Sequence, residues 1–268
     1  MTRIFFTLLC FTIAVPLSAH EFWLKPSKFI LKKGERATLL LLVGENFAGE
    51  PWKFNQSRVI TFVQCHKNEA QQITPIVKDS VAAPIDLMFS ADGTHLVALH
   101  TTPKFIELDG KKFTEYLKED GLDDILALRE QRGESEKSGR ELYRRCAKTL
   151  VQTGTTTDST FKRIMNFPLE IVPETNPYSM GSASSANMSV QIFFKGKPLA
   201  NALVRTWHKA GGKVETASLR TDGNGRASFA CTATGEWMVS LVKMVEAEDK
   251  TQADYESFWA SLTFGFDS

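Results

Sequence analysis

The stretch Val59-Ile60-Thr61-Phe62-Val63-Gln64-Cys65-His66 alternates between two sets of side chains. A period of two indicates a β-strand whose successive side chains point to opposite faces of a sheet. Working outward, residues 37–43 and 95–100 are further short runs of strand-forming residues, and a turn signal at residues 91–94 precedes the second of them. Several short strands at this spacing predict a β-sandwich over residues 20–105.

A second set of strand signals fills residues 187–268. Trp237, Val239 and Leu241 share one face of an expected strand. The sequence Thr221-Asp222-Gly223-Asn224-Gly225 is a strong turn signal, because Gly and Asn tolerate positive φ. We therefore predict a second β-sandwich over residues 187–268, preceded by a strand and a Pro-, Gly- and Ser-rich linker at residues 156–186.

Between these parts, residues 106–155 have a different pattern. Apolar residues recur at helical spacing, and Gly121 and Gly133 are expected to separate three short helices, the last marked by Leu142, Cys146 and Leu150. The charged residues of this segment fall mainly on the other faces, which predicts a solvated surface. The overall prediction is a mainly β protein, with two β-sandwiches and a helical insertion between them.

The first nineteen residues predict export. Residues 4–15 form an apolar run after Arg3, and Leu17-Ser18-Ala19 ends in the small residues typical of a cleavage site. This order is typical of a secretory signal peptide, and the run is shorter than the roughly 20 residues that a membrane-spanning helix needs. We expect cleavage after Ala19, a periplasmic location and no membrane insertion of the mature chain. A cut a few residues later is the alternative, and it would remove His20.

Composition limits the partners. Arg3 is the only charged residue before His20, so removing it from 32 basic residues leaves 31, against 31 acidic residues. A neutral chain offers no basic field for nucleic acid. Cys65, Cys146 and Cys231 remain after cleavage and form no CxxC motif. We expect buried free thiols, with one disulfide or an intermolecular bond as alternatives.

His20 is the main candidate for chemistry. A histidine at a free amino terminus offers the α-amine and the ring Nδ1, a nitrogen pair that suits Cu(II) and Ni(II). His95 is the preferred partner ligand and His100 the reserve, although their odd spacing on one strand predicts opposite faces. The competing interpretation is that His20 is merely the first ordered residue and the histidines are structural. No GxSxG, HExxH or P-loop motif occurs, so we expect a protein that is not an enzyme.

Several motifs resemble one known family. Ala19-His20-Glu21-Phe22-Trp23-Leu24 is similar to the start of mature proteins in the domain of unknown function 4198 family. Further similar segments are Gly44-Glu45-Asn46-Phe47, Gly93-Thr94-His95-Leu96-Val97, Gly235-Glu236-Trp237 and Asp254-Tyr255-Glu256-Ser257.

The resemblance implies two immunoglobulin-like or carboxypeptidase-regulatory-like sandwiches, and a periplasmic component of nickel or cobalt uptake. It points to His20 and His95 as ligands, while Lys243 stands where relatives often carry histidine. The first hypothesis is thus a non-enzymatic protein that binds nickel, cobalt or copper. The second is an envelope interaction module that binds a transporter or receptor through its sandwiches. A copper oxidase is a third, weaker interpretation, because it needs a second nearby histidine and an open coordination position.

Overall fold

The computed structural model describes residues 21–74, 82–180 and 185–266, and its strands form one large sheet and two small ones. The large sheet has the order β15-β14-β17-β18-β10-β8-β5-β6, and β2 and β9 also pair with β10. Its strands are β2 Ile30–Leu31, β5 Val59–His66, β6 Glu69–Gln72, β8 Gly93–Thr101, β9 Lys104–Leu108, β10 Gly139–Thr153, β14 Leu203–Ala210, β15 Lys213–Arg220, β17 Gly235–Glu246 and β18 Tyr255–Phe266.

The two small sheets come from the two ends of the chain. The N-terminal sheet contains β1 Glu21–Pro26, β3 Glu35–Glu45, β4 Ala48–Pro51 and β7 Ile85–Phe89. The C-terminal sheet contains β11 Leu169–Pro173, β12 Ser185–Phe194, β13 Lys197–Pro198 and β16 Arg226–Thr232. Three single turns of 3₁₀ helix lie in the connections, at η1 Gln56–Arg58, η2 Ser159–Lys162 and η3 Pro177–Met180.

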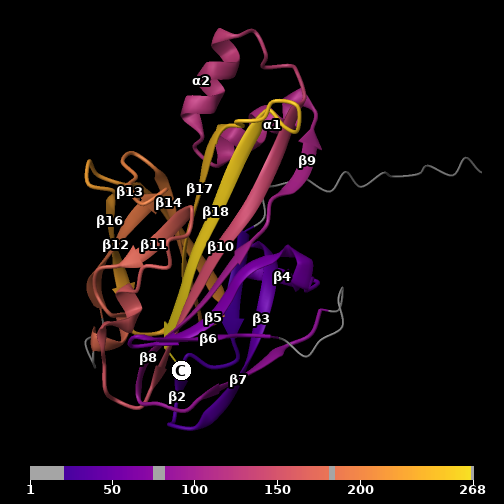
Figure 1. Ribbon diagram of the computed structural model, residues 1–268. Helices are drawn as coiled ribbons and strands as arrows, with labels where there is room; N and C mark the ends of the chain where they lie inside the picture. The colour runs from indigo at the N-terminus through magenta and orange to yellow at the C-terminus, as the bar shows by residue number, and fades with distance from the viewer. Residues whose placement is uncertain (1–20, 75–81, 181–184, 267–268) are drawn as a thin grey trace, which may run out of the picture.

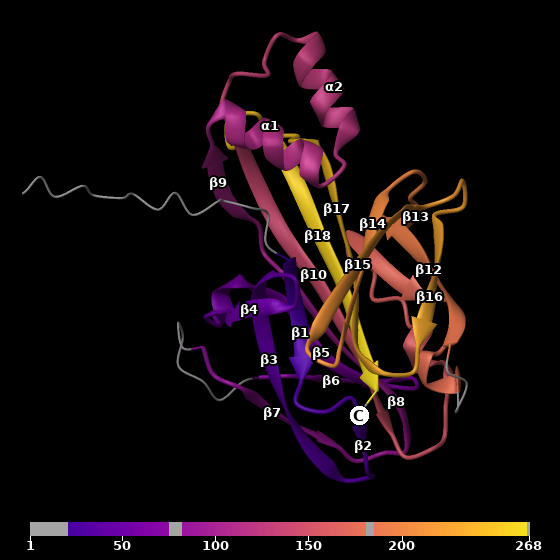
Figure 2. The same cartoon turned by 180° about the vertical axis from the view of Figure 1, so that it is seen from behind.

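The small sheets cover opposite faces of the large sheet (Figures 1 and 2). On β8, Leu96 and Ala98 pack in one apolar cluster with the C-terminal sheet, whereas Val97 and Leu99 pack in another with the N-terminal sheet. Because successive strand residues point to opposite faces, alternate residues of the same strand serve two cores. The fold is therefore two β-sandwiches that share the large sheet, and the predicted mainly β class is confirmed.

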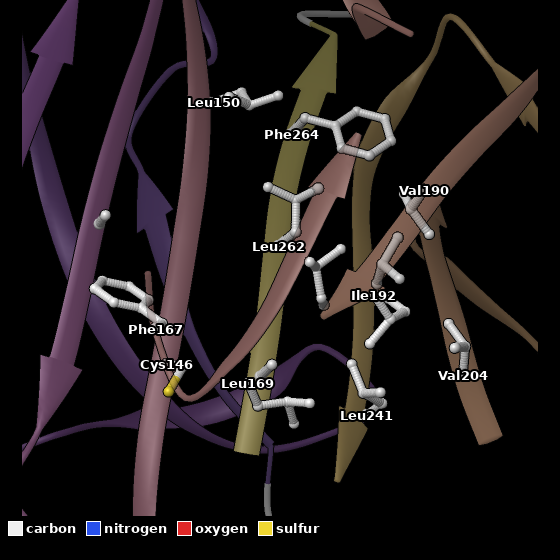
Figure 3. Packing of buried hydrophobic residues seen from close by; sticks show 14 of the residues in the cluster. Cys146, Leu150, Phe167, Leu169, Val190, Ile192, Val204, Leu241, Leu262 and Phe264 are labelled. Carbon is white, nitrogen blue, oxygen red and sulfur yellow. The ribbon is translucent and has the colours of Figure 1, made fainter. Parts of the chain in front are cut away.

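The C-terminal core shows this packing directly (Figure 3). Leu262 and Phe264 project from β18 toward Val190 and Ile192 of β12, and all four are fully buried. Cys146 of β10 lies in the same cluster. Cys65, Cys146 and Cys231 are buried free thiols, as predicted.

Two helices cap one end of the face that carries the N-terminal sheet. They are α1 Gly110–Glu119 and α2 Asp123–Gln131, and they pack on Val242, Met244 and Tyr255 of the large sheet. Both expected breaks are present, since Gly121 and Gly133 have positive φ. The expected third helix is wrong: Leu142, Cys146 and Leu150 lie on the fifteen-residue strand β10. A four-residue step is an even number, so it also keeps side chains on one face of a strand.

Side chains of the large sheet hold β1 in place and so position the candidate site. Among the described strands it pairs only with β3, and its other edge lies against β18. Ser261 Oγ donates to the carbonyl of Phe22 at 2.6 Å, and Thr263 Oγ1 donates to that of Leu24 at 2.6 Å. Side-chain donors thus satisfy an edge that would otherwise be open. They fix the first described residues of the chain on the face of the large sheet.

Candidate functional site

A band of polar side chains crosses the large sheet between the N-terminal sheet and the helices. We define the polar band by Glu21 of β1, Asp120 after α1, Glu141 and Arg145 of β10, and Arg205 of β14. Cross-strand partners connect it: Arg145 with Trp259, Trp259 with Val242, Ser261 with Ser240, and Ser240 with Arg205. The band is a strip of charged groups inside an otherwise apolar interface.

Glu21 and Asp120 form the end of the band nearest the start of β1. Glu21 is 7% exposed and Asp120 is 4% exposed. Burial raises the pKa of Glu21 to about 7, and the charge of Asp120 contributes in the same direction. Burial also raises the pKa of Asp120 to about 6, against the opposing effect of Arg205. Glu21, Arg205 and Ser240 also line a small crevice there.

Arg205 compensates only part of the negative charge of Glu21 and Asp120. Its Nη1 donates to Asp120 Oδ1 at 2.6 Å, and its Nη2 donates to the carbonyl of Glu119. Asp120 Oδ2 is buried and has no hydrogen-bond partner. A buried carboxylate oxygen without a donor is costly, and such an atom in a native fold needs an explanation.

Glu141 forms the part of the band beneath the helices. It accepts hydrogen bonds from Tyr116 Oη at 3.2 Å and from Ser257 Oγ. Trp259 Nε1 donates to the same Ser257 Oγ at 3.0 Å, and the Trp259 ring stacks on Tyr116. Burial raises the pKa of Glu141 to about 7, although these hydrogen bonds act in the opposite direction. Asp120 raises it further, so the acids of the band are electrostatically linked.

This arrangement can respond to an incoming cation. Glu21, Asp120 and Glu141 each hold a proton more tightly than an ordinary carboxyl group, because charging them in a buried setting is unfavourable. A cation that enters the band would release those protons and gain oxygen ligands. Buried titratable groups with perturbed pKa values are typical of functional sites.

Two of the three histidines predicted as ligands, His95 and His100, lie apart in the fold. His20 lies outside the described residues. His95 and His100 lie on opposite faces of β8, as their odd spacing predicts: His95 packs on Phe89 of the N-terminal sheet and His100 on Phe167, next to the C-terminal sheet. They cannot join one site.

His95 instead belongs to a histidine pair. Its ring stacks on His66 at a centroid distance of 4.7 Å, and its Nε2 lies 2.9 Å from the carbonyl oxygen of Ala91. Burial lowers the pKa of His95. His66 Nε2 lies 3.6 Å from Asp158 Oδ2. The pair links β5 and β8 to the connection that contains η2.

His95 is also far from the start of β1. Its cross-strand partner is Val151 of β10, whereas the guanidinium of Arg145, on the same strand, lies over the Phe22 ring at 4.8 Å. The step from residue 145 to 151 covers about 20 Å at roughly 3.3 Å per residue. The start of β1 therefore lies near Arg145 and not near His95.

Comparison with protein families gives one match. The model of the domain of unknown function 4198 (DUF4198) matches residues 17–244. The chain belongs to the DUF4198 family. No curated protein matches it.

Solved structures resemble this DUF4198 protein only distantly. The D0-D1 domain of intimin has 13% identity, covering 91% of this chain and 97% of that one, with a TM-score of 0.23. A chain from a study of host cell surface retention of a 1.5-MDa bacterial ice-binding adhesin has 11% identity, covering 94% and 65%, with a TM-score of 0.23. Scores this low carry no argument, so the fold assignment rests on the strand pairing described above.

Two features are absent from the described part of this DUF4198 protein. Residues 21–74, 82–180 and 185–266 contain no cluster of three or more His, Cys, Asp or Glu side chains able to hold a metal ion. Over the same ranges, no helix has the length and apolar character to cross a membrane.

Sequence reasoning missed Asp120, Glu141 and Arg145. All three lie in the segment that was predicted to be a solvated helical surface, and nothing in the local pattern marks Asp120 and Glu141 as buried or Arg145 as half-buried. The available signal was the family motif that starts at His20, since it directs attention to whatever surrounds Glu21.

Proposed function

We propose that this DUF4198 protein is exported to the periplasm and binds a transition-metal ion at its mature amino terminus. Its role would be accessory to the uptake or handling of nickel, cobalt or copper. The protein binds the ion as cargo and does not catalyse a reaction. The residues around the start of β1 support this role.

The observation that carries the proposal is the buried carboxyl pair beside the start of β1. Glu21 directly follows His20 in the sequence, and Asp120 lies close enough for its charge to act on Glu21. Asp120 Oδ2 has no donor, and Arg205 is the only cation hydrogen-bonded to that carboxylate among the described residues. A positively charged ligand would complete this site.

Cleavage after Ala19 would supply the remaining ligands. The new α-amine and the ring Nδ1 of His20 are two nitrogen donors on one residue, and an α-amine has a pKa near 8, so a metal can displace its proton. Carboxylate oxygens from Glu21 or Asp120 could add to the nitrogen pair. Mixed nitrogen and oxygen donors suit Ni(II) and Cu(II) in tetragonal geometry.

Isothermal titration of the exported, mature protein with Ni²⁺, Co²⁺ and Cu²⁺ tests the proposal. We expect one ion per chain when the chain begins at His20. We expect at least a tenfold weaker affinity after His20→Ala, after adding one glycine before His20, and after Asp120→Asn. Asp124→Asn is the matched control, because Asp124 lies four residues further along the chain, is exposed and pairs with Lys243.

Two results would contradict the proposal. One is a mature chain that starts beyond His20, determined by intact-mass measurement of the periplasmic protein. The other is metal binding that is equally tight in the glycine-extended and unextended proteins. Either result would favour an envelope interaction module with structural histidines.

A further inference from the structure

Arg145 is a guanidinium group without a carboxylate or carbonyl partner, and its side chain interacts with the hydroxyl group of Tyr143. It is half-buried on β10, where its side chain lies over the Phe22 ring at 4.8 Å and over the Tyr143 ring at 5.5 Å. Its Nη1 is buried and has no hydrogen-bond partner. Aromatic faces attract a cation, but they accept none of its directional N–H donors as a carboxylate does.

The other described arginines differ from Arg145 in their hydrogen-bond partners. Each of them donates from its guanidinium to a carboxylate or carbonyl oxygen, whereas Arg145 has no such bond. Removing a charged group from water without pairing it is unfavourable, and burial lowers the pKa of Arg145 to about 10. The fold tolerates this cost at Arg145 alone among its described arginines.

A second guanidinium reinforces the positive charge. Arg58 lies over the same Tyr143 ring at 5.9 Å and donates to the carbonyl of Thr102 at 3.3 Å. The charge of Arg58 acts on Arg145, and no carboxylate is among the charges that act on it. Two guanidinium groups therefore share one aromatic ring, and no carboxylate among the described residues offsets the charge of Arg145.

The group is within reach of solvent. Arg58 and Tyr143 are half-buried, and Phe105 is 48% exposed on β9, where its neighbour Lys104 pairs with Tyr143. A ligand could therefore approach from the β9 side of the large sheet, over the edge of Tyr143.

We propose that Arg145 and Arg58 bind the oxyanion of a small ligand, a carboxylate or a phosphate, at the exposed edge of the Tyr143 ring that both guanidinium groups face. A planar guanidinium donates two parallel hydrogen bonds to such a group, which is the partner that Arg145 lacks. This site requires no metal and does not depend on His20. It stands whether or not the amino terminus binds an ion.

Titration calorimetry on metal-free mature protein, with malonate and with inorganic phosphate as the probes, tests the site. We expect one saturable anion per chain, and the probe with the tighter affinity identifies the chemical source. Arg145→Gln should weaken binding at least tenfold. Arg145→Lys should weaken it less, because lysine keeps the positive charge but cannot donate two parallel hydrogen bonds. Arg36→Gln should change it by less than twofold, because Arg36 is exposed and pairs with Asp86 on the N-terminal sheet.

Two results would overturn the proposal: no saturable binding of either anion by the wild-type protein, or Arg145→Gln binding as tightly as wild type. If Arg145→Gln does not fold, as judged by its melting curve, Arg58→Gln provides the same comparison. In that case, affinity unchanged by Arg58→Gln would reject the shared site.

Discussion

Replacing Glu141 with Gln should change how stability depends on pH. In the native protein the pKa of Glu141 is raised from 4.5 to about 7 by burial, whereas an unfolded chain gives it an ordinary value. Between these values the native state holds a proton that the unfolded state has released. This contribution to stability is complete below pH 4.5 and is lost as the pH rises through 7. At about 1.4 kcal/mol per pH unit, the loss amounts to about 3 kcal/mol.

Glu141→Gln removes this titration, because an amide stays neutral. Its Oε1 can still accept from Tyr116 and Ser257, which are the donors to Glu141. Urea unfolding at half-unit steps from pH 4.5 to 8.5 should show a free energy of unfolding that falls by about 3 kcal/mol less in Glu141→Gln than in wild type. Glu107→Gln, an exposed change on the neighbouring strand, is the control. Parallel pH profiles for wild type and Glu141→Gln would refute the reasoning.

Three further changes have defined outcomes. Burial lowers the pKa of His100 to about 4, so its stabilising contribution is complete above pH 6.5 and is lost as the pH falls to 4. The wild type should therefore lose about 3 kcal/mol of unfolding free energy over this range, and His100→Phe should not. Acid unfolding curves measure this difference. Leu262→Ala should cost about 2–5 kcal/mol in urea unfolding, because the side chain is fully buried between β18 and the C-terminal sheet. Gly139→Ala should cost about 1–3 kcal/mol, because a Cβ there would lie 2.5 Å from the Phe113 ring; a thermal midpoint equal to wild type would contradict this.

The sequence was most informative where strand-forming residues or a turn signal mark a segment locally. The turn at residues 221–225 lies between β15 and β16, and the run from 95 to 100 falls within β8, both as predicted. The alternation of Trp237, Val239 and Leu241 correctly predicts a face in the C-terminal core. These patterns are local, so they can be interpreted without knowledge of the partner strands.

β10 shows why other features could not be predicted. Its second half, residues 146–153, is buried on both faces, so the polar and apolar alternation that marks a strand is absent there. Lys148 lies within it, 2% exposed, and pairs with Glu170. In the sequence, a charged residue of this kind looks like part of the exposed face of a helix, and its burial is evident only when its tertiary partner is known. Likewise, the parallel pairing of β10 with β18 joins segments more than a hundred residues apart, which no local pattern encodes.

None of the described residues of the candidate site was predicted from the sequence, and the predicted ligand His20 lies outside the described residues. His20 was singled out because of what a free amino terminus can ligate, and the partners chosen for it were other histidines. The fold instead places Asp120 and Arg205 next to Glu21, and His95 beside His66. Acidic residues in a charged segment carry no signal of burial, so the carboxyl pair becomes visible only once α1 is packed on the sheet.

The most direct test of the proposed amino-terminal metal site is an anomalous difference map from crystals of the mature protein soaked in Ni²⁺. The account predicts one peak about 2 Å from the α-amine and ring nitrogen of His20, next to the carboxylates of Glu21 and Asp120. A strong peak at His66 and His95, or no ordered nickel in crystals of a chain that begins at His20, would contradict it.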